Sequence, residues 1–597
     1  PAESAAAASG SDTADGEFWS AVESGDITRL SSVLEVTGDD VEAFGTLLPA
    51  LASWRRRRTL RSTLDGWRYR VTWTALTGAG GTVPGGRWPV LVPSGHADDS
   101  WVADVLGALA ARGLRIERHD LTGDEDTAAL TALLTTGTGD GPDSDGDAPT
   151  GVLSLLALDE RPHPDHPAVP RGLAAAKDLV HALSGTGARL WALTRGAVSV
   201  DGRDPLTSPV QAETWGFGRA VALELPDAWG GLADVPAEPD SRCLVRLAAL
   251  LGGDEDQIAV RTSGAYARRL ARMPLPEPTA ATEDAPSVTA STDDAPSVTA
   301  STDDAPTVTA AGEDDGIGGW GDHDTVLITG GTGALGAHVA RSLAAHGARH
   351  LVLTSRRGPD APGVSELVAE LTGLGARVTV ADCDVADRDQ LARLLAGLPA
   401  ELPLTGVVHA AGVLDDGVVD GLTPERFATV FRAKVTSALL LDELTRAHGP
   451  EVFALFSSAS AAVGNPGQGT YAAANAVLDA LAERRRAEGL PATSVAYGAW
   501  DGEGMAGGER AAALARRTGI RPLDPDLAVL ALRQVVTGTD PVAVGADVDP
   551  DRFVRAFTSV RPSRLLAEMP AHAALSAAPD GGRDARQSGP ALRERLA

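Results

Sequence analysis

Cysteine and aromatic side chains are scarce in this sequence of 597 residues. Its two cysteines, Cys243 and Cys383, are too few for a disulfide framework or a cysteine-based zinc site. Aromatic residues make up 4% of the chain, whereas apolar residues as a whole make up 43%. We therefore expect a large core that is built mainly from small aliphatic side chains.

Long apolar runs are also absent. No run of 18 apolar residues occurs, and the first 20 residues lack the basic and apolar regions of a secretory signal. The 52 basic and 81 acidic residues give a net charge of −29, which argues against non-specific binding to nucleic acid or to an anionic membrane. These absences predict a cytoplasmic protein without a nucleic-acid or membrane partner.

Lysine and tyrosine are rare enough to be informative. The basic residues are nearly all arginine, and the only lysines are Lys177 and Lys434. Tyr69, Tyr266, Tyr471 and Tyr497 are the four tyrosines. A lysine or tyrosine that persists in so biased a composition points weakly to a role, and chance retention is the alternative.

Residues 274–320 have the composition of a linker. A ten-residue repeat begins at residue 281 and occurs three times, and the span has ten acidic residues but no lysine or arginine. High net charge and low hydrophobicity oppose a packed core, so we expect a disordered acidic linker.

A short helical element and a longer α/β part precede this linker. In residues 16–60, the side chains of Phe18, Trp19, Leu30 and Leu34 recur at about helical spacing. A helical element of this size buries little surface alone, so it must pack on its own chain or on a second copy.

Two doubly wound parallel sheets are expected on either side of the linker, which makes the fold class α/β. Residues 64–273 alternate buried strands with helices, but the turn Ser94–His96 after the first parallel strand lacks glycine-rich phosphate-binding residues. This part is therefore a degenerate Rossmann-like subdomain. Residues 321–565 repeat the alternation more sharply, and residues 566–597 have the composition of a C-terminal linker. In 321–565, strands are expected at 325–329, 350–354, 377–381, 405–409, 452–456 and 493–497.

A glycine-rich turn follows the strand expected at 325–329. Gly331, Gly333 and Gly336 form G-x-G-x-x-G, with Thr332 and Leu335 between them, directly before a helix expected at 333–347. Glycines let the backbone turn tightly and approach a pyrophosphate, which the positive end of the helix stabilises. The turn therefore predicts a dinucleotide site, and a glycine-rich turn without a ligand is the alternative.

The ends of the next two strands predict which dinucleotide is bound. Ser355, Arg356 and Arg357 follow the strand at 350–354, where a site selective for NAD usually has an acid. Arginine can instead form charge-assisted hydrogen bonds with a 2′-phosphate, which predicts NADPH. A solvated surface pair is the alternative. Asp384, which precedes Val385, either accepts from the adenine amino group or caps a helix.

A hydroxyl, a phenol and an ammonium group occur where carbonyl reduction would need them. Ser458 ends the strand at 452–456, and Tyr471 follows thirteen residues later with Asn475 on the same helix face. A phenol with a pKa near 10 is a slow proton donor, so a nearby ammonium would help. Lys434, on a helix expected at 424–447, is the only lysine in this half. The alternatives are a core phenol and a surface lysine.

Together these motifs resemble the ketoreductase region of modular type I polyketide synthases, within the short-chain dehydrogenase/reductase superfamily. The resemblance covers residues 17–565. It rests on Gly331–Gly336, Thr354–Gly358, His409–Gly412, Ser458 and Tyr471–Asn475, and it places Ala410, Ala411 and Gly412 beside the cofactor. It also implies that Ser458, Tyr471, Lys434 and Asn475 form the catalytic tetrad.

The resemblance implies a substrate and partners. The substrate would be a β-ketoacyl chain, linked as a thioester through phosphopantetheine to an acyl carrier protein. NADPH would deliver hydride, Tyr471 the proton, and Ser458 would hold the carbonyl oxygen. Lys434 would lower the phenol pKa and contact the ribose, while Asn475 would hold the geometry or a water. Residues 16–60 would form a homodimer, 64–273 would brace the catalytic part, and neighbouring synthase domains would complete a multifunctional enzyme of antibiotic biosynthesis.

The resemblance also predicts the stereochemistry of reduction. Leu414, Asp415 and Asp416 match the Leu-Asp-Asp that marks the B-type, which guides the chain from that side and forms the D-configured alcohol. The opposite type has Trp where Val463 stands, and the epimerising subtype has Pro where Ala473 stands. The alternative is that the two aspartates only cap a turn. Trp500 and Met505 would flank the substrate groove and lid, and Tyr497 stands where the family often has Trp.

Three rival functions remain from the sequence. The main alternative is a reduction-inactive homologue that binds nucleotide or only shapes the synthase. A stand-alone dehydrogenase would leave the degenerate first half unexplained. A reductase of a fatty-acid-type megasynthase is a more closely related alternative.

Overall fold

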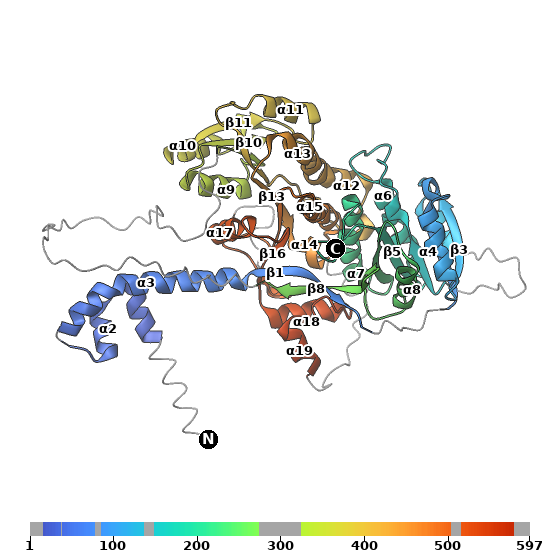
Figure 1. The fold of residues 1–597 in the computed structure, drawn as a ribbon, viewed down its shortest axis with the longest axis horizontal. Coiled ribbons are helices and arrows are strands. Elements are labelled where there is room, and N and C mark those ends of the chain that lie inside the picture. The colour runs from blue at the N-terminus through green and yellow to red at the C-terminus, as the bar shows by residue number, and fades with distance from the viewer. Residues whose placement is uncertain are drawn as a thin grey trace, which may run out of the picture. The chain divides into compact units, whose positions relative to one another are not determined.

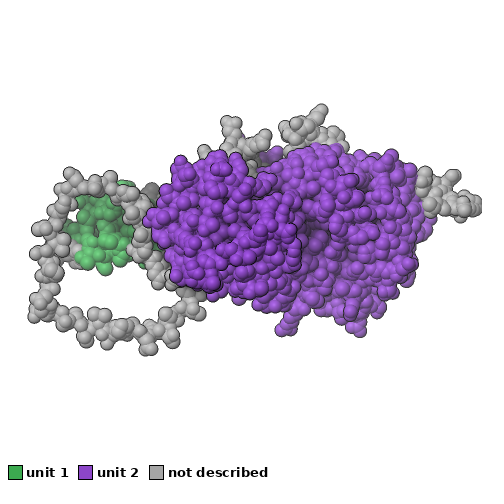
Figure 2. All heavy atoms as spheres, turned by 90° about the horizontal axis from the view of Figure 1, so that it is seen from above, with its two compact units in different colours: residues 1–68 green, residues 69–597 purple. Residues whose placement is uncertain are grey.

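The computed structural model describes residues 16–37, 39–77, 85–135, 149–273, 324–502 and 515–577. The predicted linker at 274–320, the predicted groove residue Met505 and the chain beyond residue 577 lie outside these ranges. The described residues divide between one compact unit within residues 1–68 and a second within residues 69–597 (Figure 2).

The first unit is helical, as its apolar spacing predicted. Residues 16–24 are helical, and helices α2 (Ile27–Leu34) and α3 (Asp39–Gly66) follow. Asp26 caps α2 by accepting a hydrogen bond from the backbone N–H of Arg29 at 2.9 Å. A small core gathers Ala21, Val22, Leu30, Leu48 and Ala52. Leu30 was expected to face a second copy, but it is only 1% exposed because its own unit covers it.

One continuous sheet of 15 strands runs through the second unit (Figure 1). Its order is β11-β10-β9-β12-β13-β14-β16-β1-β8-β7-β6-β5-β4-β2-β3. The first half of the chain contributes β1 (Arg68–Ala75), β2 (Arg87–Pro93), β3 (Arg115–Leu121), β4 (Gly151–Ser154), β5 (Arg189–Arg195), β6 (Trp229–Val235), β7 (Gln257–Arg261) and β8 (Gly264–Arg272). Both predicted doubly wound parts are present, and β1, paired antiparallel with β8, joins them into one sheet.

The second half of the chain forms an entirely parallel set of seven strands. These are β9 (Thr325–Thr329), β10 (His350–Ser355), β11 (Arg377–Asp382), β12 (Leu404–His409), β13 (Val452–Ser458), β14 (Thr493–Tyr497) and β16 (Val542–Gly545). The strand order reverses between β9 and β12, which is where doubly wound sheets bind their ligands. We call this half, residues 324–577, the catalytic half.

Helices and two short strands complete the catalytic half (Figure 1). The helices are α9 (Ala334–Ala345), α10 (Val364–Gly373), α11 (Arg388–Ala396), α12 (Pro424–Phe431), α13 (Ser437–Thr445), α14 (Ala459–Val463), α15 (Gly469–Ala487), α17 (Pro525–Val536), α18 (Pro550–Val560) and α19 (Pro570–Ala577). The short strands β15 (Ile520–Arg521) and β17 (Asp547–Val548) pair antiparallel.

Leu566 and Met569 are buried, so the fold continues past the boundary expected at residue 565. Composition placed that boundary too early because these apolar residues are few and isolated.

Residues 69–273, which we call the bracing half, repeat the strand–helix alternation with a different strand order. Helices α4 (Ser100–Ala110), α5 (Thr127–Thr135), α6 (Arg171–Ala182), α7 (Ala212–Glu224) and α8 (Ser241–Leu250) connect its strands. The parallel strands follow the order β3-β2-β4-β5-β6-β7. At the turn after β2, the guanidinium of Arg161 lies 3.5 Å from where a Cβ of Gly95 would be, and it pairs with Asp159. A side chain therefore lies against the turn that holds phosphate in a dinucleotide-binding sheet.

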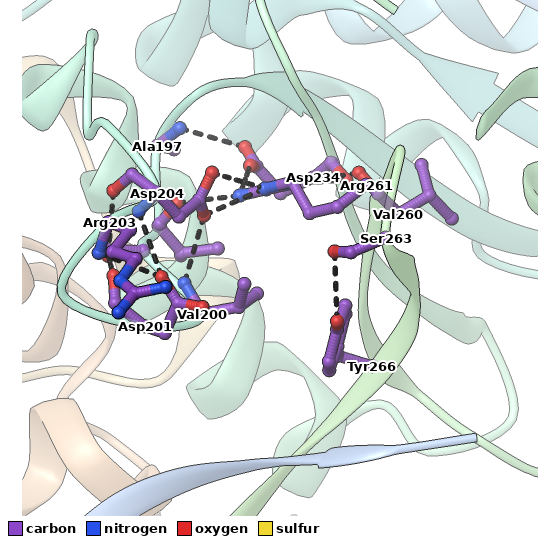
Figure 3. Close-up of polar contacts among 12 residues, drawn as sticks. Ala197, Val200, Asp201, Arg203, Asp204, Asp234, Val260, Arg261, Ser263 and Tyr266 are labelled. Atoms are coloured by element: carbon purple, nitrogen blue, oxygen red, sulfur yellow. Dashed lines mark hydrogen bonds and ion pairs between the residues drawn. The ribbon is translucent and has the colours of Figure 1, made fainter. Parts of the chain in front are cut away.

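A buried charge network fixes the loop after β5 (Figure 3). Arg261 donates to Asp204 at 2.7 Å and to Asp234 at 2.8 Å, and the Asp234 side chain is fully buried. Asp234 also accepts from Thr194 and from the backbone N–H of Ala197. Burial raises the pKa of Asp234, although the Arg261 guanidinium opposes that shift. The network holds the loop that carries Leu206 into a cluster with alanines of α14 and α15.

The two halves of the second unit pack backbone against backbone. A side chain at Gly216 in α7 would overlap the carbonyl group of Ala472 in α15. Arg268 in β8 donates a hydrogen bond to the carbonyl oxygen of Ala462 at 2.6 Å. The bracing half is therefore a direct support of the helix that carries Tyr471.

No helix in the described ranges is long and apolar enough to cross a bilayer.

Candidate active site

A cavity of about 1190 Å³ lies in the catalytic half, where the glycine-rich turn, the ends of β10, β12 and β13, and α15 meet. Most residues predicted from the sequence line it. These are Thr332, Gly333, Leu335, Gly336, Ser355, Arg356, Arg357, Asp384, Val385, Ala410, Ala411, Gly412, Leu414, Lys434, Ser458, Tyr471 and Trp500. Gly331, Asp415, Asp416 and Asn475 are not among the lining residues, although each is adjacent in sequence or bonded to a residue that is.

The turn between β9 and α9 needs its glycines. Gly330 has a φ of 66°, and a Cβ there would lie 2.9 Å from the Cα of Ala411. A Cβ on Gly336 would overlap the carbonyl oxygen of Gly330. Gly333 caps α9 without a side-chain hydrogen bond, so the first N–H groups of the helix have no side-chain acceptor at the cap. This end of the cavity can hold an anionic diphosphate.

The end of β10 presents donors without acceptors. The hydroxyl of Ser355 is buried and has no hydrogen-bond partner. Arg356 and Arg357 line the cavity and are exposed, and no ion pair with a carboxylate of the described residues holds either guanidinium. A buried hydroxyl without a hydrogen-bond partner beside two exposed guanidinium groups fits a phosphate on the adenosine ribose. The residues present therefore fit NADPH.

Asp384 does not cap the helix that follows it. Asp387 is the N-cap of α11, and its carboxylate accepts from the N–H groups of Asp389 and Gln390. The carboxylate of Asp384 instead pairs with Arg432 at 2.6 Å. The capping alternative is therefore wrong, and the predicted contact with adenine stays a prediction.

Lys434 lies on a π-helical segment rather than on a continuous α-helix. The predicted helix at 424–447 is interrupted between α12 and α13 by five residues, Arg432–Thr436, that form a π-helix. Such segments are rare and often occur at functional sites. Lys434 is 2% exposed, and its Nζ donates to the carbonyl oxygen of Phe456 at 2.8 Å. Burial lowers the pKa of the Lys434 ammonium to about 7.

His409 holds this π-helical segment against the sheet. Its Nε2 lies 3.0 Å from the carbonyl oxygen of Lys434, and its Nδ1 lies 2.7 Å from the hydroxyl of Thr329. A carbonyl oxygen can only accept, so Nε2 carries the proton and Nδ1 accepts from Thr329. Burial lowers the pKa of His409 to about 3, which keeps the ring neutral. The sequence indicated His409 only as part of a motif and gave no signal for this role.

Ser458 is oriented by its neighbour. It ends β13 and caps α14, and Ser460 donates both its N–H, at 3.2 Å, and its hydroxyl, at 2.9 Å, to the Oγ of Ser458. The hydroxyl proton of Ser458 is therefore free to point into the cavity.

Tyr471 and Asn475 share a face of α15, as their spacing predicted. The Nζ of Lys434 lies 5.2 Å from the centre of the Tyr471 ring. Burial raises the pKa of Tyr471 to about 12, and the Asn475 amide only partly offsets this. Asn475 donates to the backbone carbonyl of Tyr471 at 2.8 Å, while its own Oδ1 is buried without a partner. That oxygen could accept from a water, as the resemblance implied.

The two aspartates of the Leu-Asp-Asp segment bond to side chains. Arg426 donates to the carboxylate of Asp415 at 2.7 Å, and Gln468 donates to the carboxylate of Asp416 at 2.9 Å. Leu414 lines the cavity. Side chains, rather than the N–H groups of a turn, thus donate to both carboxylates.

An aromatic wall closes the other side of the cavity. The ring of Tyr497 lies 5.2 Å from Trp500 and 5.5 Å from Phe456. The Tyr497 hydroxyl donates to the carbonyl oxygen of Ala528 at 2.9 Å, so this departure from the family pattern is accommodated. Sequence reasoning missed Phe456, and it missed Leu223, which the bracing half contributes to the lining. Only the tertiary structure brings Leu223 there.

Three family models match consecutive parts of the chain. The polyketide synthase dimerisation element domain matches residues 15–61. The Rossmann fold domain of polyketide synthase extender module SpnB matches residues 73–270, and the KR domain matches residues 324–502. The predicted helical element and degenerate subdomain lie close to the first two matches, and the third match covers residues 324–502 of the catalytic subdomain predicted at 321–565.

Curated relatives and solved structures are similar over most of the chain. Polyketide synthase GfsA of Streptomyces halstedii is 44% identical over 97% of this chain, which spans 7% of that protein. Pikromycin polyketide synthase component PikAIII of Streptomyces venezuelae is 44% identical over 88% of this chain, which spans 30% of that protein. A solved structure described as A-type ketoreductases from a modular polyketide synthase is 43% identical, with a TM-score of 0.73, and covers 86% of this chain and 99% of its own. The chain therefore belongs to the ketoreductases of modular type I polyketide synthases.

Proposed function

We propose that the chain reduces a β-ketoacyl thioester, carried on an acyl carrier protein, to the D-configured β-hydroxyacyl thioester, with NADPH as reductant. One observation carries the proposal. Lys434, Ser458 and Tyr471 line the same cavity as the glycine-rich turn and the arginine pair. That cavity can therefore hold a dinucleotide and a carbonyl group side by side.

Tyr471 is the proton donor in this proposal. Because the pKa of its phenol is about 12, the group stays protonated at neutral pH and can protonate an alkoxide as it forms. Ser458, whose proton is free, donates a hydrogen bond to the carbonyl oxygen that becomes negative. Lys434 stabilises negative charge near the phenol and the ribose when it is protonated.

The cofactor is held by donors from this chain. When bound, the reduced nicotinamide supplies the hydride. The first turn of α9 faces the diphosphate, while Ser355, Arg356 and Arg357 face the 2′-phosphate. Ala410, Ala411 and Gly412 line the cavity between the glycine-rich turn and Lys434.

The Leu-Asp-Asp segment supports D-configured product. Leu414 lines the cavity, and side chains anchor both aspartates beside it, so this wall can steer a substrate chain. The solved relative described as A-type shares the fold, but the sequence feature that marks the opposite type is absent here because Val463 replaces Trp. A non-epimerising reaction follows from Ala473.

The direct test is NADPH oxidation with a diketide thioester, followed by chiral chromatography of the product. We expect a predominantly D-configured alcohol. Cofactor binding without any oxidation would instead support the reduction-inactive homologue, and a predominantly L-configured alcohol would contradict the B-type assignment.

Tyr471→Phe tests the proton donor. We expect turnover to fall by about 100-fold or more, whereas the dissociation constant of NADPH stays within about twofold, because the phenol acts on the substrate oxygen. Turnover is measured by NADPH absorbance and binding by fluorescence. Retained turnover would assign the proton to another group.

A further inference from the structure

A carboxylate of the bracing half reaches two loops of the catalytic half. Glu224 is the last residue of α7. One of its oxygens accepts from the backbone N–H of Val419 at 2.7 Å, and the other accepts from the backbone N–H of Gly467 at 2.8 Å. These partners lie 195 and 243 residues away in sequence. Glu224 therefore bridges two segments that have no covalent connection nearby.

Both segments carry residues of the proposed site. Val419 follows the Leu-Asp-Asp segment by three residues, and Gly467 directly precedes Gln468, whose amide donates to Asp416 at 2.9 Å. A second link joins the same segments, because the N–H of Gly417 donates to the carbonyl oxygen of Gly467 at 2.8 Å. The segment from Gly464 to Gln468 then leads directly into α15 and Tyr471. The Glu224 carboxylate therefore fixes the spacing between the Leu-Asp-Asp segment and α15, the helix that carries Tyr471.

The rest of α7 supports the same wall. Leu223, beside Glu224, lines the cavity. Gly464 has a φ of 84°, and a Cβ there would lie 2.6 Å from the carbonyl oxygen of Arg219 in α7. Any shift of α7 would therefore displace both the cavity lining and the segment that precedes Tyr471.

The chemistry at this position requires a carboxylate. Each oxygen of Glu224 accepts from a backbone N–H, and hydrogen bonds from N–H groups to an ionised acceptor are stronger than those to a neutral one. A carboxamide offers one acceptor and one donor, so one of the two backbone N–H groups would face an opposing N–H group. Glutamine thus preserves the volume of the side chain but breaks one of the two links.

We propose that Glu224 is a positioning residue through which the bracing half sets the stereochemical outcome and the rate of reduction. The proposal rests on the proposed function for its substrate. It gives the bracing half a role in catalysis beyond support of the fold.

Glu224→Gln and Glu224→Ala test the proposal, with Asp227→Asn as the matched control. Asp227 is an exposed acid just beyond α7, so its change removes a charge at the same place without touching either loop. In each variant we would measure kcat and KM for the diketide thioester, the product configuration, the dissociation constant of NADPH and the melting temperature.

We expect kcat to fall by about tenfold or more, the share of the minor enantiomer to rise several-fold, and the NADPH constant to stay within about twofold. A fall in activity that tracks the melting temperature, with unchanged product configuration, would overturn the proposal because it would show a structural role only. If Glu224→Ala does not fold, Glu224→Gln alone decides.

Hydrogen exchange separates this proposal from the proposed function. In Glu224→Gln we expect faster amide exchange in segments 414–420 and 464–468 than in the wild type, whatever the substrate. Unchanged exchange in these two segments would refute the positioning role of Glu224, even if the enzyme is active. A wild type that forms L-configured alcohol would refute the B-type assignment. It would not refute the positioning role of Glu224, which predicts only that the product configuration of the variant differs from that of the wild type.

Discussion

At the scale of single residues, the site places ionisable groups where burial opposes their charge. Lys434 is 2% exposed and its pKa is lowered to about 7, while the pKa of His409 is lowered to about 3 and that of Tyr471 is raised to about 12. Of these three groups, only Lys434 changes its charge near neutral pH. Lys434 and Tyr471 line the cavity, and His409 supports Lys434 from behind it. Strongly shifted pKa values that gather at one site are typical of active sites.

The affinity for NADPH should report the charge of Lys434. An anionic cofactor favours the protonated lysine, so affinity is highest below pH 7 and declines as the pH rises through about 7. The 2′-phosphate also titrates, near pH 6. We therefore predict that the ratio of the dissociation constants of the wild type and Lys434→Met moves toward one above about pH 7. Fluorescence titrations from pH 6 to 9 would check this, and a ratio that does not change with pH would contradict it.

Arg356 and Arg357 should select the cofactor. Their replacement by serine removes two guanidinium groups that face the predicted 2′-phosphate, so NADPH binding should weaken by about 100-fold and NADH binding by no more than about twofold. Arg377→Ser, at the start of β11, is the control. Equal losses for the two cofactors would show that the pair is a surface feature.

At the scale of elements, the strand ends and the π-helical segment fit each other closely. A Cβ on Gly412 would lie 2.9 Å from the Cε of Lys434, so the lysine side chain passes through the space that this glycine leaves open. His409, three residues earlier, bonds to the carbonyl oxygen of the same lysine. The short segment from His409, the last residue of β12, to Gly412 thus positions both the backbone and the side chain of Lys434.

Gly412→Ala should therefore act through Lys434. We expect the methyl group to displace the lysine side chain and to lower kcat by about tenfold or more, with little loss of stability. Gly373→Ala is the control, because a Cβ there meets nothing within 4 Å and the residue ends a helix. Unchanged kcat in Gly412→Ala would show that Lys434 has room to move without cost.

At the scale of the whole molecule, the first unit leaves apolar surface uncovered by its own residues. Leu34, Leu47 and Trp54 are 37%, 55% and 40% exposed. The match to a dimerisation element domain and this exposed surface support a homodimer. This exposed surface differs from the one that the helical spacing of apolar residues predicted, because Leu30 is buried in the core of the first unit.

Leu47→Glu should convert the dimer to a monomer, since a carboxylate in an apolar interface has no partner. Sedimentation velocity of the full chain measures the change, and Thr28→Glu, at an exposed position of α2, is the control. Identical sedimentation of wild type and Leu47→Glu would place any dimer interface elsewhere.

The sequence by itself determined the features that depend on local pattern. The alternation of apolar runs and helical stretches predicted both doubly wound halves, and the strand–glycine–helix order predicted the nucleotide turn. The spacing of Ser458, Tyr471 and Asn475 predicted their shared place because strand ends and helix faces follow from short-range geometry. Residues in the same local pattern need no knowledge of the rest of the chain.

Only the tertiary structure decided what depends on partners far away in sequence. The joining of two sheets by β1 and β8, the π-helical setting of Lys434 and the neutral bridge of His409 leave no local mark. Glu224 is the clearest case, because its carboxylate is one acid among many in the sequence. Its role depends on the backbone N–H groups of Val419 and Gly467, which come close to the carboxylate only when α7 packs beside α15. The periodicity of the sequence does not predict that contact.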